Sequence, residues 1–166
     1  ICRKLRKNND NIKIIEQSNK GQFEARRVGI QNAKGKYIMF LDADDCFCEN
    51  TVTKMEKLIK KYNEPDLIRF RYKKVQNGYE QYKYTDEEEK EILKKDFKTF
   101  VYPMFLNTYM LNALWTNCIK SEILKNIEMD SDDVRYGEDL LLNLEIFSNI
   151  QNIVFDNEIL YQYIYP

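Results

Sequence analysis

The sequence has no histidine, only three prolines and five glycines, and four cysteines in 166 residues. Without histidine, a Ser/His or Cys/His nucleophilic pair is excluded, and a zinc hydrolase would lack its commonest ligand. The cysteines form no C-x-x-C pair, which predicts free thiols in a reducing compartment. No apolar run has the length of a membrane span and no signal peptide is evident, so we expect a soluble, cytoplasmic protein.

The charge is balanced overall but unevenly distributed. The net charge is −1, whereas residues 1–36 carry ten Lys and Arg against three Asp and Glu. Such a basic stretch suits a polyphosphate ligand or peripheral association with an anionic membrane surface, and it equally suits lysine-rich helix faces in solvent. Nucleic-acid binding is not expected, because the charge is balanced and no matching motif is present.

An unbroken apolar run, YIMFL at residues 37–41, leads directly into Asp42, Asp44 and Asp45. The run has no polar alternation, so we expect a strand covered on both faces, as at the centre of a parallel sheet. Ligands bind at the carboxyl end of such strands in open α/β sheets. Clustered carboxylates repel one another, and a hard divalent cation, Mg²⁺ or Mn²⁺, would offset that repulsion.

The same aspartates also suit purely structural roles. A short carboxylate after a strand commonly serves as a turn residue or a helix N-cap. A calcium loop of the EF-hand type is poorly supported. Its third ligand, its glycine and its terminal glutamate would fall on Cys46, Phe47 and Thr53.

The segments around these aspartates follow a specific order. NKGQFEARRVGI (19–30) precedes AKGKYIMFLDADD (33–45), and GED (137–139) opens an apolar segment near the end of the chain. This order resembles the family 2 glycosyltransferases with a GT-A fold. In that family an N-x-G turn, an A-R-N-x-G-I helix, a G-K-Y-I-x-F-L-D-x-D-D strand and a Glu-Asp motif follow one another. Arg27 departs from the pattern, because the family usually has asparagine there.

The resemblance implies an α/β, GT-A-like (Rossmann-like) fold, with a mostly parallel central sheet, flanking helices and an added antiparallel hairpin. Asn77-Gly78 supports the hairpin, since this pair is a strong type I′ turn signal between two alternating segments. Two earlier strands of the family, which carry donor contacts, have no counterpart here, and the chain begins at Ile1. We therefore expect residues 1–166 to form one partial catalytic domain that is inactive by itself.

The resemblance also implies roles for the donor side of the site. Asp44, with Asp42, is expected to hold Mg²⁺ or Mn²⁺ against the donor diphosphate. Asp42 and Arg26 are expected to contact the donor nucleotide. The residues themselves leave a second role open for Arg26, a structural ion pair with Glu24 or with an aspartate of the loop.

On the acceptor side, inverting sugar transfer needs a base that takes the proton of the attacking hydroxyl. With no histidine available, a carboxylate is the natural candidate, and by resemblance Asp139 takes this role with support from Glu138. Trp115 lies in a segment similar to the family's W-x-K wall of the acceptor side. Its side chain either stacks on a sugar ring or packs in the core.

The implied reaction is transfer of a sugar, with inversion, from a nucleotide-diphosphate sugar to a hydroxyl acceptor by a hexosyltransferase. The expected partners are a UDP-sugar and a saccharide or lipid-linked saccharide, in bacterial cell-surface polysaccharide or glycolipid synthesis. One rival is a phosphatase of the haloacid dehalogenase type, in which Asp42 would be the nucleophile. Another is a sugar- or nucleotide-binding module that does not turn over.

Periodicity predicts the remaining elements. We expect helices at 1–9, 22–34, 50–62, 85–103 and 140–147, and strands at 12–15, 37–41, 67–75, 79–84, 153–155 and 159–165. The helix at 85–103 rests on a Thr85/Glu88 capping box and would end near Pro103.

Overall fold

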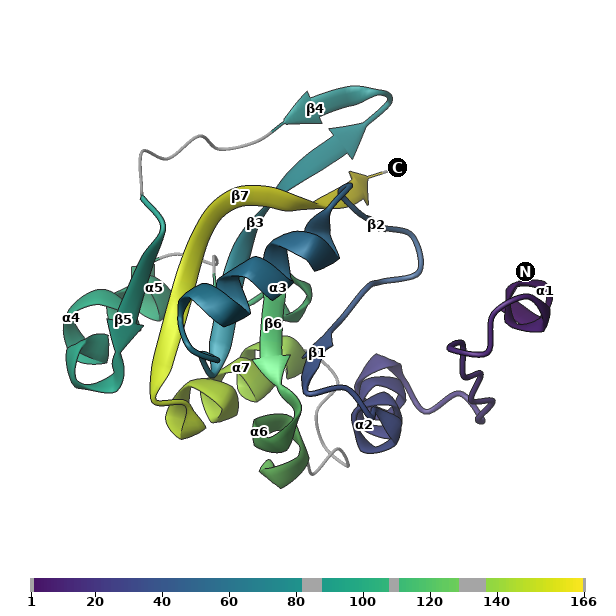
Figure 1. The fold of residues 1–166 in the computed structure, drawn as a ribbon, viewed down its shortest axis with the longest axis horizontal. Coiled ribbons are helices and arrows are strands. Elements are labelled where there is room, and N and C mark those ends of the chain that lie inside the picture. The colour runs from purple at the N-terminus through teal and green to yellow at the C-terminus, as the bar shows by residue number, and fades with distance from the viewer. Residues whose placement is uncertain (1, 82–87, 108–110, 129–136, 166) are drawn as a thin grey trace.

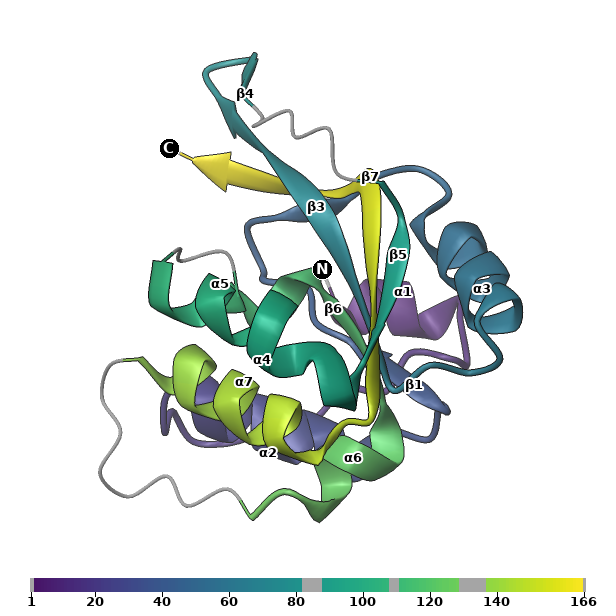
Figure 2. The ribbon, with the colours of Figure 1, turned by 90° about the vertical axis from the view of Figure 1, so that its left-hand side faces the viewer.

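The computed structural model describes residues 2–81, 88–107, 111–128 and 137–165. Its strands form one seven-stranded sheet with helices on both faces (Figures 1 and 2). The helices are α1 (Cys2–Lys7), α2 (Gln22–Asn32), α3 (Thr51–Lys61), α4 (Phe97–Phe100), α5 (Tyr102–Asn107), α6 (Ser121–Asn126) and α7 (Glu138–Asn149), with 3-10 turns η1 (Lys94–Asp96) and η3 (Leu114–Thr116). The strands are β1 (Tyr37–Met39), β2 (Cys46–Phe47), β3 (Leu67–Gln76), β4 (Tyr79–Gln81), β5 (Lys90–Leu93), β6 (Asn117–Lys120) and β7 (Asn152–Tyr165).

The sheet has the strand order β1-β6-β3-β7-β2, with β4 paired to β3 and β5 paired to β7. Among the described strands only β3 and β7 pair in parallel, and the other five pairings are antiparallel. The expectation of a mostly parallel sheet is therefore wrong. The unbroken apolar run before the aspartates indicated burial on both faces, but burial does not determine strand direction. The unpredicted strand β6 lies between β1 and β3 and is antiparallel to both.

Two apolar layers lie on opposite faces of the sheet, and successive residues of β3 alternate between them. Leu67 faces the layer beneath α2, α4, α6 and α7, and Ile68 faces the layer beneath α3. The partners of Leu67, Ile119 and Ile153, join the first layer, whereas the partners of Ile68 join the second. Burying such an aliphatic side chain contributes about 1.5–3 kcal/mol to the free energy of folding. The central strands, which carry these side chains, therefore stabilise the domain.

Several elements form where periodicity placed them. The helices at 22–34, 50–62 and 140–147 correspond to α2, α3 and α7, and the Asn77-Gly78 hairpin joins β3 to β4. The two strands expected at 153–155 and 159–165 are a single strand, β7. It follows β3 through register shifts near Arg69 and Arg71.

Two local expectations are wrong. Residues 12–15 form no strand, because they find no pairing partner among the described residues and lie mostly at the surface. A continuous helix at 85–103 is not found: residues 90–93 form β5, which pairs with β7 and places its buried Ile92 opposite Ile153, and among the described residues of this stretch helical structure begins only at η1 and α4. Burial of Ile92 against the sheet outweighs the local helical pattern. Thr85 lies outside the described residues, and Pro103 falls at the start of α5, where its ring is tolerated.

At the N-terminus, α1 lies apart from the sheet and has no buried residue (Figure 1). All four cysteines are among the described residues, and all are free thiols, as expected. Within the described ranges, none of the helices combines the length and the apolar character that crossing a bilayer requires.

Candidate active site

A cleft of about 450 Å³ lies between α2 and the segment that follows β1. Its α2 wall includes Gln22, Arg26 and Gly29, and its other wall runs from Ile38 to Ala43. Phe40 and Asp42 lie at the end of the apolar run, so the cleft opens where the strand gives way to the aspartate turn. This is the end of the strand at which the sequence placed the ligand site.

Arg26 joins two predicted site residues that lie far apart in the sequence. Its Nη2 donates to Asp42 Oδ1 at 3.0 Å, and its Nη1 donates to Asp139 Oδ1. The Arg26 side chain is 9% exposed, and its guanidinium carbon lies 6.0 Å from the centre of the Phe40 ring. The structural ion pair considered for Arg26 is therefore present. Its partners are Asp42 and Asp139, whereas Glu24 pairs with the neighbouring Arg27.

The carboxylates available to a cation are those of Asp42 and Asp44. Asp42 Oδ1 accepts hydrogen bonds from Arg26 and from Gln22 Nε2, the latter at 3.1 Å. Among the described residues, no hydrogen bond reaches Asp42 Oδ2, and the exposed Asp44 has neither a hydrogen bond nor an ion pair. No group of three or more His, Cys, Asp or Glu side chains in the described ranges could hold a metal by itself.

This donor set nevertheless suits Mg²⁺ or Mn²⁺ in one common arrangement. Mg²⁺ keeps several waters and is usually bound through one or two carboxylates together with substrate phosphates. The free oxygen of Asp42 and the free carboxylate of Asp44 supply that number of protein ligands. The third aspartate does not contribute.

Asp45 is 7% exposed and does not line the cleft. Its Oδ2 accepts the Tyr161 hydroxyl at 2.7 Å, and its Oδ1 accepts the backbone N–H of Ile164 at 2.8 Å. The metal site expected from the sequence consists of Asp44 and Asp42, and Asp45 is not part of it. Hydrogen bonds to β7 satisfy the Asp45 carboxylate, so no cation is required there.

Asp139 and Glu138 lie in the first turn of α7. Gly137 precedes them with a φ of 79°, a left-handed conformation that glycine adopts without strain. Burial raises the pKa of the Asp139 carboxyl, against the lowering effects of Arg26 and of the Leu114 backbone amide, and the Glu138 charge raises it further. Asp139 is thus a stronger base than an exposed aspartate, while Arg26 favours its ionised form.

Trp115 belongs to η3, beside Leu114, and is half-buried. Its ring stacks on Tyr161 with the centroids 4.4 Å apart and on Tyr163 with the centroids 5.8 Å apart. Of the two alternatives for Trp115, the structure shows the packed one.

Two residues of the site were not identified from the sequence, Gln22 and Tyr161. Gln22 donates to Asp42, and the Tyr161 hydroxyl accepts the Asp42 backbone N–H at 3.3 Å. Gln22 is the first residue of α2, so its position next to the N-x-G turn was a usable signal. Tyr161 carried no such signal, because it lies in a tyrosine-rich strand and its partner is 119 residues away.

Comparison with known proteins identifies the family of this chain. The family model described as "Glycosyl transferase family 2" matches residues 1–117, a segment that contains Arg26, Asp42 and Asp44 but not Asp139. Glycosyltransferase GlyA of Streptococcus pneumoniae is 25% identical over 98% of this chain and 24% of its own length. The uncharacterised glycosyltransferase EpsJ of Bacillus subtilis is 26% identical over 98% of this chain and 47% of its own length. The chain thus spans about a quarter to half of these relatives.

Solved structures of S. aureus TarS share the fold. The structure of its residues 1–349 superimposes with a TM-score of 0.74 at 21% identity, covering 97% of this chain and 46% of that one. A second TarS structure, in complex with UDP-GlcNAc, gives a TM-score of 0.69 at 20% identity over 92% of this chain and 41% of that one. This similarity confirms the expected GT-A-like fold.

Proposed function

Because the chain belongs to glycosyl transferase family 2, we propose that its protein transfers a sugar from a UDP-sugar to a hydroxyl group of a saccharide or lipid-linked saccharide acceptor. The reaction proceeds with inversion and serves the synthesis of a cell-surface polysaccharide or glycolipid. The TarS complex with UDP-GlcNAc supports a uridine nucleotide donor and makes UDP-GlcNAc the first donor to test.

The observation that carries this proposal is the bridge that Arg26 forms between Asp42 and Asp139. Asp42 lies just after a strand, at the carboxyl end where ligands bind in α/β folds, and Asp139 lies in the first turn of a helix and reaches the same arginine. A sugar held between them would have its leaving group near one carboxylate and the attacking hydroxyl near the other. This is the arrangement that a single displacement requires.

In the proposed step, the oxygen of the acceptor hydroxyl attacks the anomeric carbon. The bond from that carbon to the diphosphate oxygen breaks, UDP leaves with the electron pair, and Asp139 takes the hydroxyl proton. The raised pKa of Asp139 suits it to this proton transfer, and the Glu138 charge contributes to that rise. Attack opposite the leaving group inverts the anomeric carbon.

A divalent cation is part of the proposal. Asp44 and the free oxygen of Asp42 would hold Mg²⁺ or Mn²⁺, with waters and the donor phosphates in the remaining positions. When bound, such an ion neutralises the charge that develops on the leaving diphosphate. Arg26 keeps the second carboxylate, Asp139, ionised and oriented whether or not the cation is present.

The phosphatase alternative requires Asp42 as a nucleophile. Family membership argues against it, since the match includes the aspartate segment. A binding module without turnover differs from the transferase only in catalysis, so an activity measurement separates the two.

The first experiment is calorimetric titration of the intact protein with UDP, with and without Mn²⁺, repeated on Asp44→Ala. We expect Mn²⁺-dependent binding that Asp44→Ala weakens at least about tenfold. Glu49→Ala, at an exposed position a few residues later, is the matched control and should bind normally. Equal binding by Asp44→Ala and the wild type would exclude the metal role, and absence of UDP binding in every protein would exclude the uridine nucleotide donor.

Turnover is then measured as UDP released from UDP-GlcNAc in the presence of saccharide acceptors. Release that requires an acceptor supports the transferase. Donor binding without any release, across donors and acceptors, would favour the binding module.

A further inference from the structure

The aspartate turn, residues 42–45, is hydrogen-bonded to strand β7 at both ends of the turn. The turn itself closes through a hydrogen bond from Asp45 N–H to the Asp42 carbonyl, at 3.2 Å. At its start, the Asp42 N–H donates to the Tyr161 hydroxyl, and at its end the Asp45 carboxylate accepts from Tyr161 and from the Ile164 N–H. Directly afterwards β2 pairs with β7, with Phe47 opposite Tyr161. A single strand therefore fixes the whole turn.

Tyr161 is central to this connection, and aromatic packing fixes its ring. Its side chain is fully buried between Trp115, which stacks on it, and Phe47, which meets it edge-on with the centroids 5.6 Å apart. Because packing holds the side chain in place, its hydroxyl stays within hydrogen-bonding distance of Asp42 and Asp45. The next tyrosine, Tyr163, joins the same stack, but no hydrogen bond to its hydroxyl is found among the described residues.

We propose that Asp45 and Tyr161 are positioning residues that hold Asp42 and Asp44 in the geometry that binds the donor diphosphate and its cation. This inference rests on the proposed function, since it assigns these residues to the same site. Asp44 has no hydrogen bond or ion pair of its own among the described residues, so its position in the turn depends on its neighbours. Asp45 and Tyr161 are both buried, and their hydrogen bonds hold the turn in place.

Orientation of metal-binding carboxylates by hydrogen-bonded neighbours is a general feature of metal sites. Loss of such a neighbour typically lowers metal affinity or activity about 10- to 100-fold. Asp45 meets the requirements for this role, since it is buried, both of its oxygens are hydrogen-bonded, and it does not face the cleft. Its presence in the DADD sequence is therefore accounted for without direct contact with the donor.

The test compares Tyr161→Phe with Tyr163→Phe in the intact protein. Each variant removes one hydroxyl from the same stack, but only the first removes the acceptor for Asp42 and a donor to Asp45. In Tyr161→Phe we expect the amide hydrogen of Asp42 to exchange at least about tenfold faster, and the Mn²⁺ concentration that half-saturates UDP binding to rise about tenfold. Tyr163→Phe should leave both quantities unchanged.

A second pair of variants separates positioning from general stability. Asp45→Asn keeps an acceptor oxygen and the side-chain volume, so it should retain more Mn²⁺-dependent UDP binding than Asp45→Ala. With turnover as the readout, both should raise the Mn²⁺ requirement and the KM for the donor more than they lower kcat at saturation.

The outcomes distinguish this inference from the proposed function. Unchanged Mn²⁺ dependence in Tyr161→Phe, with UDP still bound, would overturn the positioning role alone. Absence of UDP binding by the wild-type protein at any Mn²⁺ concentration would overturn the proposed function together with it. Faster Asp42 exchange with a raised Mn²⁺ requirement would establish the role.

Discussion

Two clusters in this domain have a similar composition. In each, one basic side chain is shared by two or three carboxylates. In the Arg26 site, defined by Arg26, Asp42 and Asp139, two nitrogens of one guanidinium contact two carboxylates. In the Lys54 cluster, one ammonium group is shared. Lys54 Nζ lies 2.6 Å from Glu158, 3.4 Å from Asp156 and 3.5 Å from Glu89. Burial raises the pKa of one carboxyl in each, Asp139 in the first and Asp156, to about 6, in the second.

Access to the carboxylates distinguishes the two clusters. The side chains of Asp42 and Asp139 are 23% and 25% exposed, and Asp42 lines the cleft. The Asp156 side chain has no exposed surface, and neither of its oxygens accepts a hydrogen bond from the described residues. A raised pKa therefore marks both a candidate catalytic carboxylate and a buried one that no substrate can reach.

The largest effect is expected from removal of the shared arginine. Arg26→Met leaves the Asp42 and Asp139 carboxylates facing each other without a cation, and breaking a fully buried pair in this way costs about 3–5 kcal/mol. Because both carboxylates are about a quarter exposed, we expect a loss of about 2–3 kcal/mol in the free energy of unfolding, measured by urea denaturation. UDP binding should be lost as well.

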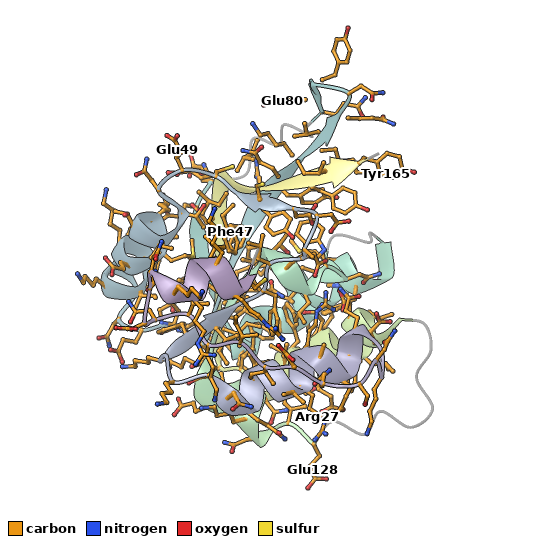
Figure 3. All side chains as sticks on the ribbon, turned by 90° about the vertical axis from the view of Figure 1, so that its right-hand side faces the viewer. Arg27, Phe47, Glu49, Glu80, Glu128 and Tyr165 are labelled. Carbon is orange, nitrogen blue, oxygen red and sulfur yellow. The ribbon has the colours of Figure 1, made fainter. Side chains whose placement is uncertain are left out.

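Arg27→Met is the matched control for Arg26→Met. Arg27 is the next residue of α2, and its ion-pair partner among the described residues is Glu24, one turn away on the same helix. Figure 3 shows Arg27 on the outer side of α2. If both variants unfold at the same urea concentration, the Arg26 bridge does not stabilise the fold as described.

The second prediction concerns the Lys54 cluster, where removal of a charge should stabilise the protein. The folded-state pKa of Asp156, about 6, lies above its ordinary value of 3.8. Its contribution to stability is therefore fully present below pH 3.8 and is lost as the pH rises through about 6. Asp156→Asn removes that loss, and we expect the free energy of unfolding at pH 8 to rise by about 3 kcal/mol.

The measurement is urea denaturation of wild type and Asp156→Asn between pH 4 and pH 8. The curves should converge at low pH and separate as the pH increases. Lys54 keeps Glu158 and Glu89 as partners in the variant, so its own charge stays compensated. Glu158→Gln is the control, since that side chain is half-exposed and its removal should change stability little. A less stable Asp156→Asn at pH 8 would show that the Lys54 contact outweighs the burial of Asp156.

The comparison also shows what the sequence could predict. The positions of β1, α2, α3 and the β3–β4 hairpin followed from periodicity and turn residues, because those signals lie within each segment. The pairing of β5 with β7 did not, since Ile92 is buried only by contact with a strand much later in the chain. Strand β6 was missed because its four residues are too short for a periodic signal.

Some features of the site could likewise be predicted from the sequence, and others could not. Asp42, Arg26 and Asp139 could be named from the family resemblance, and the structure brings them together. The orientation of Asp45 could not be predicted, because DADD contains no local feature that sends one aspartate toward β7 and leaves another exposed. The partner of Asp45, the Tyr161 hydroxyl, is visible only once the strands are in place.

The smallest effect is expected from the charge next to the candidate base. The Glu138 charge adds to the burial that raises the pKa of Asp139, so Glu138→Gln should lower that pKa. A base acts when deprotonated, so kcat/KM of the intact protein should fall as the pH drops through the pKa of Asp139, and Glu138→Gln should move this acidic limb to lower pH. Glu145→Gln, at an exposed position on the same helix, should leave it unchanged. Identical limbs for wild type and Glu138→Gln would mean that Glu138 does not tune the base, and a limb that persists in Asp139→Asn would assign the proton transfer to another group.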